Sequence, residues 1–113
     1  TDKLLPLLSK TLNNHWHPDL IERFGTLPIA TPEKQLAMAE KWLPSHSEDA
    51  DLLLALGRIC RRLEFMGKAR DYLSTAITID PRPQIYLELA QVLDILGEPE
   101  ASADMYRQGL EAR

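Results

Sequence analysis

The chain has 113 residues, 44% hydrophobic and 27% charged, which fits one soluble globular domain at most. Its net charge of −4 gives no field that would attract nucleic acid or an anionic membrane. The single cysteine, Cys60, excludes an intramolecular disulfide and a zinc site built from cysteines. No apolar run reaches the ~18 residues that span a bilayer, and no signal peptide follows Thr1. We therefore expect an excised soluble segment of a longer protein.

Helical periodicity runs through the sequence, whereas β-branched alternation and tight hairpin dipeptides are absent. The pattern predicts seven helices, at about 3–13, 18–24, 31–43, 50–63, 66–79, 84–96 and 99–112. Thr31 is expected to cap the third helix, and Pro44 to stop it. Gly25 is expected to end the second helix in a left-handed conformation, ahead of a looser stretch at 26–30. Gly97 is expected to end the sixth helix before the last helix begins.

Short turns between helices of this length predict antiparallel pairs, and the pairs recur with a period of 33 residues. Small residues return at small positions and large apolar residues at large ones. The matched pairs are Leu56 with Leu89, Gly57 with Ala90, Cys60 with Leu93, Ala69 with Ser102, Leu73 with Tyr106, and Ala76 with Gly109. Small residues let two helices approach closely, and large ones fill the space around that point. We therefore predict an all-α solenoid.

At these positions the sequence resembles the tetratricopeptide repeat, whose two helices carry small and large residues at set offsets. The first copy supplies Leu53, Leu56, Gly57, Cys60, Ala69, Leu73, Ala76 and Pro81, and the second supplies Tyr86, Leu89, Ala90, Leu93, Gly97, Ser102, Tyr106 and Gly109. Cys60 in place of tyrosine and a missing tryptophan are the departures in the first copy. We expect a single repeat domain with degenerate helices at 1–49 and repeats at 50–82 and 83–113.

A more specific resemblance covers nearly the whole chain. The segments that carry it are Asn14–Ile21, Pro32–Leu43, Asp51–Arg58, Gly67–Leu73 and Leu96–Ala101. Together they are similar to the C-terminal part of the HemY family, bacterial proteins associated with protoheme IX biosynthesis. The resemblance implies a parent with two N-terminal membrane helices and a repeat domain on the cytoplasmic face of the inner membrane. It implies no reaction and no catalytic residues.

The suggested link to heme directs attention to iron ligands. His15, His17 and His46 are expected at helix ends or in loops, and Cys60 at a large-apolar helix position where a buried hydrophobe is the natural interpretation. Zinc would need three or four ligands at workable spacing, and the histidines lack such partners. No nucleophile with a matching base is present either. We expect no enzyme activity, no cofactor and no metal.

The functional surface of such a solenoid is its concave face, lined by the first helix of each pair. The repeat register places nine residues on this partner-binding groove: Asp51, Leu54, Arg58, Arg61, Arg62, Gln84, Leu87, Gln91 and Asp94. Arg58 lies mid-helix, where it could grip a partner carboxylate through two N–H groups. Two interpretations fit Arg61 and Arg62 equally well. They could bind a partner in the same way, or they could be solvated charges at the C-terminal end of the helix, where the dipole favours cations.

Three functions fit this sequence: an interaction scaffold in heme biosynthesis, a generic repeat assembly module unrelated to heme, and a heme or porphyrin carrier. The first combines the fold with the family resemblance, and the third has few ligands to support it. The expected partner is a protein or peptide, with a heme-pathway enzyme as the specific candidate. The last helix has no successor to cover its outer face. Either the parent protein supplies a capping helix after Arg113, or this end pairs with another molecule, so pairing with a second copy is a further expectation.

Overall fold

The computed structural model describes residues 4–27 and 31–112. Within those ranges the chain is helical and has no strand. The helices are α1 (Leu4–Asn14), α2 (Pro18–Thr26), α3 (Pro32–Glu40), α4 (Ala50–Arg62), α5 (Met66–Ile79), α6 (Pro83–Ile95) and α7 (Pro99–Glu111), with a short 3-10 turn, η1 (Leu43–Ser45), after α3. Residue 3 and most of the looser stretch expected at 26–30 lie outside the described residues. None of the described helices is long and apolar enough to cross a membrane.

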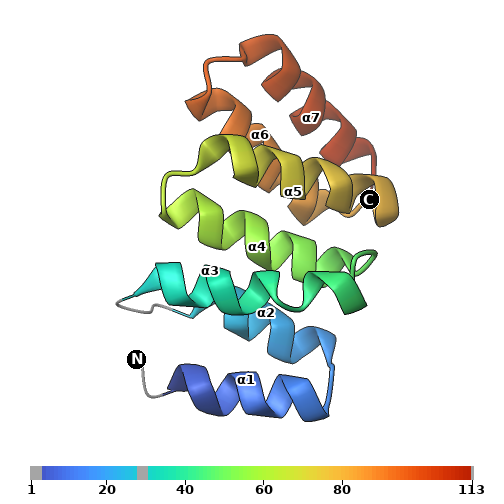
Figure 1. Cartoon of the computed structure of the whole chain (residues 1–113). Helices are drawn as coiled ribbons and strands as arrows, with labels where there is room; N and C mark the ends of the chain where they lie inside the picture. Colours follow the sequence, from blue (N-terminus) through green and yellow to red (C-terminus); the bar gives the residue numbers. More distant parts are fainter. Residues whose placement is uncertain (1–3, 28–30, 113) are drawn as a thin grey trace.

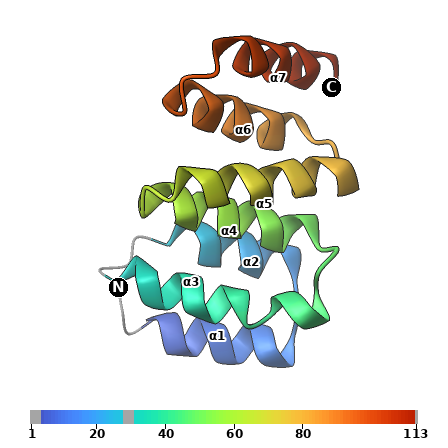
Figure 2. The ribbon, with the colours of Figure 1, turned by 45° about the horizontal axis from the view of Figure 1, so that its top comes forward.

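The helices stack into an elongated solenoid, with α1 at one end and α7 at the other (Figures 1 and 2). Its principal extents are 41, 25 and 21 Å. Helix α4 packs against α2, α3 and α5, and α6 packs against α5 and α7. The prediction of an all-α solenoid of antiparallel helix pairs is confirmed.

The expected end of α2 at Gly25 is wrong. Helix α2 continues to Thr26, and Gly25 lies inside it without a positive φ. The reason for glycine is close packing against α4: a Cβ at residue 25 would lie 2.7 Å from the Cβ of Ala55 and 2.8 Å from its Cα. Gly25 therefore allows two helix backbones to touch, rather than ending one of them.

The expected continuation of the third helix to residue 43 is also wrong. Helix α3 ends at Glu40, and the chain passes through a turn into η1. A proline ring clashes with the carbonyl four residues before it, and residue 40 stands in that relation to Pro44. The helix therefore ends one turn before the proline, and the proline is accommodated in η1.

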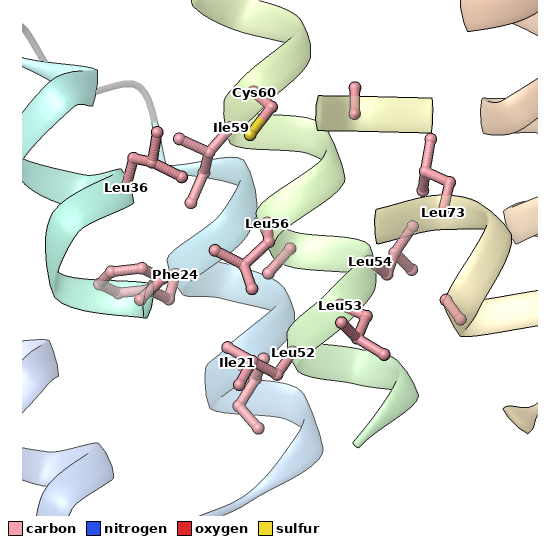
Figure 3. Close-up of a cluster of buried hydrophobic side chains, with 14 of the residues drawn as sticks. Ile21, Phe24, Leu36, Leu52, Leu53, Leu54, Leu56, Ile59, Cys60 and Leu73 are labelled. Carbon is pink, nitrogen blue, oxygen red and sulfur yellow. The ribbon is translucent and has the colours of Figure 1, made fainter. Parts of the chain in front are cut away.

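Helix α4 is the centre of the core, because it is buried on nearly every side. One side of it, formed by Leu52, Leu56 and Ile59, faces Ile21 and Phe24 of α2 and Leu36 of α3 (Figure 3). Toward its end, Cys60 is also fully buried, as expected of a small hydrophobe at this position. Burial raises the pKa of the Cys60 thiol to about 11, so the sulfur is protonated at neutral pH and is a poor metal ligand.

The two repeats end their first helices in the same way. Glu64 and Gly97 occupy equivalent positions, and both have positive φ, 64° and 78°. In each turn the following N–H, from Phe65 or Glu98, bonds to a carbonyl five residues earlier. This left-handed conformation costs a non-glycine residue about 1–2 kcal/mol.

Replacing Glu64 with glycine is therefore expected to raise the free energy of unfolding by about 0.5–1 kcal/mol, after allowing for the greater chain entropy of glycine. The reciprocal Gly97→Ala change is expected to lower it by about 1 kcal/mol. Urea unfolding measures both. Stabilisation by the second change would contradict this explanation of the turn.

Candidate partner-binding face

The predicted groove residues lie on α4 and α6, the first helices of the two repeats. These helices contact each other, and α2 lies against α4 from the preceding pair. We call this surface the inner face and define it by the predicted residues of α4 and α6. The structure brings most of these residues into hydrogen-bonded or ion-paired contacts with one another or with neighbouring helices.

The centre of the inner face is a charged cluster that joins the two repeats. The Nε of Arg58 lies 2.6 Å from Oε2 of Glu88, and both side chains are about four-fifths buried. Nη1 of Arg61 donates to Oε1 of Gln91 at 2.5 Å and lies 3.6 Å from the Glu88 carboxylate. Arg58 and Arg61 thus reach across to α6. A guanidinium has five N–H donors, and Glu88 takes only the one on Nε of Arg58.

Arg62 turns toward α2 and α3, which precede the first repeat and which we call the degenerate pair. Its guanidinium donates to the carbonyl of Gly25 and to Oε1 of Gln35, each at 2.8 Å. The Gln35 side chain is fully buried, and its amide nitrogen donates to the carbonyl of Phe24. Arg62 therefore caps one carbonyl at the C-terminal end of α2, where the helix dipole favours a cation. Its role here is to tie α2 and α3 to α4.

The remaining predicted residues divide by exposure. Leu54 is only 3% exposed and belongs to the core, so it supports the inner face without offering a surface to a partner. Asp51 forms an ion pair with Arg82 at 3.0 Å, and Arg82 also reaches Asp80 at 3.1 Å. The accessible ones are Gln84, Leu87 and Asp94 on α6.

Sequence reasoning did not anticipate Gln35 and Arg82 as partners of the groove residues. Gln35 had a signal, because it shares a helical stripe with the buried residues Leu36 and Ala39. A polar side chain in an apolar stripe needs a buried partner. Arg82 had no comparable signal, because its partner Asp51 is 31 positions away and the tertiary fold alone brings them together.

The three histidines do not form a ligand set. His17 caps α2 by accepting from the N–H of Asp19, and the His46 ring stacks on Trp16 with centroids 3.6 Å apart. His15 is exposed. Among the described residues, no three potential metal ligands come together.

A second polar cluster lies away from the inner face, where α3 meets α5. Oε2 of Glu40 accepts hydrogen bonds from Nζ of Lys68 at 2.9 Å and from the Tyr72 hydroxyl at 2.5 Å. Burial alone would raise the pKa of Glu40, but the bonds from Tyr72 and Lys68 outweigh it and lower that pKa. Burial, followed by the bond to Glu40, raises the pKa of Tyr72, so its hydroxyl stays a donor at neutral pH.

A Tyr72→Phe change is expected to cost about 1 kcal/mol at pH 7, because it removes a hydrogen bond to a charged acceptor. A carboxyl with a lowered pKa contributes stability above its unfolded-state pKa and loses it as the pH falls through the folded value. The difference in the free energy of unfolding between wild type and variant is therefore expected to become smaller as the pH falls from 7 to 3. Urea unfolding at the two pH values measures it, and an unchanged gap would contradict this role for Glu40.

Comparison with known proteins agrees with the repeat register. The sequence profile of the tetratricopeptide repeat matches residues 50–83 and 83–113, more than half of the chain. The chain belongs to the tetratricopeptide-repeat family. Tetratricopeptide repeats form protein-interaction modules. In this chain the module contains the two repeat copies described above. No curated protein sequence matches the chain.

Solved structures share this fold over the whole chain. A structure titled "Crystal structure of MamA" superposes with a TM-score of 0.79 at 19% identity, covering 99% of this chain and 68% of that one. A MamA MSR-1 structure gives 0.75 at 14% identity, with 98% and 66% covered. A MamA AMB-1 structure gives 0.74 at 15%, with 98% and 63% covered. This chain thus spans about two thirds of those proteins, and at these identities the likeness is one of fold alone.

Proposed function

We propose that this chain is a non-catalytic scaffold that binds a protein or peptide partner on its inner face. The observation that carries the proposal is the charged cluster shared by two tetratricopeptide repeats. Arg58, Glu88, Arg61 and Gln91 hold each other in place on facing first helices. Side chains that are already fixed lose little conformational entropy when a partner binds, which favours binding.

The chemistry of the partner follows from the donors that remain. The part of the Arg58 guanidinium not bonded to Glu88 can donate to a carboxylate, and the exposed amide of Gln84 can bond to a peptide backbone. We therefore expect a segment that places an acidic side chain or a C-terminal carboxylate near Arg58. Asp94 at the far end would repel a second acidic group there.

The finer proposal places this scaffold in a late step of protoheme IX biosynthesis, with an enzyme of that pathway as its partner. It rests on the sequence resemblance to the HemY family. A generic assembly module would use the same inner face, so the identity of the partner distinguishes the two. A porphyrin carrier is disfavoured by the buried, protonated thiol of Cys60 and by the engagement of His17 and His46.

Co-purification followed by mass spectrometry tests this assignment. We expect porphyrin-pathway enzymes to be enriched with the wild-type chain and reduced at least fivefold with Arg58→Ala, while the circular dichroism of the variant stays helical. Arg70→Ala on α5 is the control, because Arg70 is also an arginine with acidic neighbours but lies outside the inner face; its side chain is 42% exposed, against 18% for Arg58. Enrichment of unrelated proteins would favour the generic module. A Soret shift on titration with hemin would favour the carrier.

A further inference from the structure

The far end of the solenoid carries an apolar groove between the start of α6 and the end of α7. Its volume is about 260 Å³, and its lining is Pro83, Leu87, Tyr106, Gly109 and Leu110. Three of these residues are unusually exposed for their type, including Leu110 at 63%. We call this the end groove. It borders the inner face, because Leu87 belongs to both and the Tyr106 hydroxyl donates to Oδ2 of Asp94 at 3.2 Å, but none of the Arg58 cluster lines it.

The repeat itself shows what kind of element covers such a groove. Subtracting the 33-residue period gives the equivalent residues one repeat earlier: Ala50, Leu54, Leu73, Ala76 and Ile77. The first four are at most 7% exposed, and Ile77 is partly buried against the core. The helix that follows them, α6, packs on this pair. The end groove is therefore shaped to receive another first helix.

The apolar pattern of that helix can be stated. Helix α4 packs on the preceding pair through Leu52, Leu56 and Ile59 (Figure 3). In α6 the equivalent residues are Ile85, Leu89 and Val92, and all are buried. A helix that fits the end groove thus needs large apolar residues at positions i, i+4 and i+7.

The charge of that helix follows from where the net charge of the chain lies. From residue 83 onward there are six acidic and two basic residues, so this repeat carries the whole net charge of −4. Residues before it balance acidic and basic groups. A cationic helix would be attracted to this end, whereas two copies meeting end groove to end groove would repel each other.

We propose that the end groove binds a cationic amphipathic helix of a partner protein, with apolar residues at i, i+4 and i+7. The partner helix takes the place that α6 occupies on α4 and α5. Its basic residues face the acidic groups of the last repeat. This second site lies beside the inner face and shares Leu87 with it.

Two synthetic peptides test the proposal. Both follow residues 83–96, but the four polar positions Gln84, Glu88, Gln91 and Asp94 are all lysine in one and all glutamate in the other. Fluorescence anisotropy with the whole chain is expected to show binding of the lysine peptide, weakened by added salt. The glutamate peptide is expected to bind at least tenfold more weakly. Absence of binding by the lysine peptide, or equal binding of the two, would overturn the proposal.

Two variants place the binding site. Leu110→Glu is expected to weaken binding of the lysine peptide at least tenfold, whereas Leu7→Glu on α1 is expected to leave the affinity for this peptide unchanged. The two leucines are equally exposed, 63% each, and Leu7 lines a similar apolar groove at the opposite end. An equal loss of peptide affinity in both variants would contradict the assignment of the binding site to the end groove. So would a wild-type dimer in sedimentation equilibrium that Leu110→Glu dissociates, because the occupant would then be a second copy.

Discussion

Replacing Gly25 with alanine is expected to lower the free energy of unfolding by about 3 kcal/mol, near the upper end of the usual cost of overpacking. The added methyl group would meet the Cβ and Cα of Ala55 at less than 3 Å. A backbone atom cannot move aside as the end of a flexible side chain can. Helices α2 and α4 would have to separate, which would open the seam between the degenerate pair and the first repeat. Urea unfolding of the purified chain measures the loss.

Gly67→Ala is the matched control for this change. Gly67 is also a helical glycine, near the start of α5, but an added Cβ would meet no atom within 4 Å. Alanine there is expected to stabilise the chain by about 0.5–1 kcal/mol through its higher helix propensity. A similar loss of stability in both variants would show that the effect comes from the loss of glycine in general and not from the contact with Ala55.

Truncating Phe24 to alanine is expected to cost about 4 kcal/mol, the usual range for a buried aromatic residue. Phe24 is 0% exposed, and its ring packs edge to face on Trp42 with centroids 5.0 Å apart. Its carbonyl also accepts the hydrogen bond from the buried amide of Gln35. A cavity at this point therefore weakens both the apolar and the polar contacts among α2, α3 and α4.

Phe65→Ala provides the comparison, because Phe65 is the second phenylalanine of the chain and is 46% exposed before α5. We expect it to cost less than about 1.5 kcal/mol. Thermal unfolding followed by circular dichroism is sufficient to separate the two. Comparable losses would mean that the degenerate pair contributes little to the stability of the solenoid.

The helices and the repeat were predictable because their signals are local. The spacing of Leu53, Leu56 and Gly57 defines one face of a helix, and its return 33 residues later defines the stacking. The two wrong boundaries came from local signals with more than one physical meaning. A glycine such as Gly25 can end a helix or allow a neighbouring helix to pack closely. A proline such as Pro44 can end a helix at the preceding residue or one turn earlier.

The helices that carry the predicted groove residues were predictable, but the contacts of those residues were not. The repeat register places Arg58 and Gln91 on first helices, yet it cannot say that Arg58 pairs with Glu88 or that Arg62 turns toward Gln35. Such pairs depend on side-chain direction and on the distance between helices, which a sequence pattern does not contain. Leu54 illustrates this, since the helix position that suggested exposure is covered in the structure.

Site-specific photo-cross-linking to the co-purifying protein tests the central claim most directly. A photoreactive residue at Gln84 or Asp94, both exposed on α6, is expected to form cross-links to the partner. The same residue at Asp71 or Ser74, both exposed on α5, is expected to form none. Cross-links from α5 alone would contradict binding on the inner face, whatever the identity of the partner.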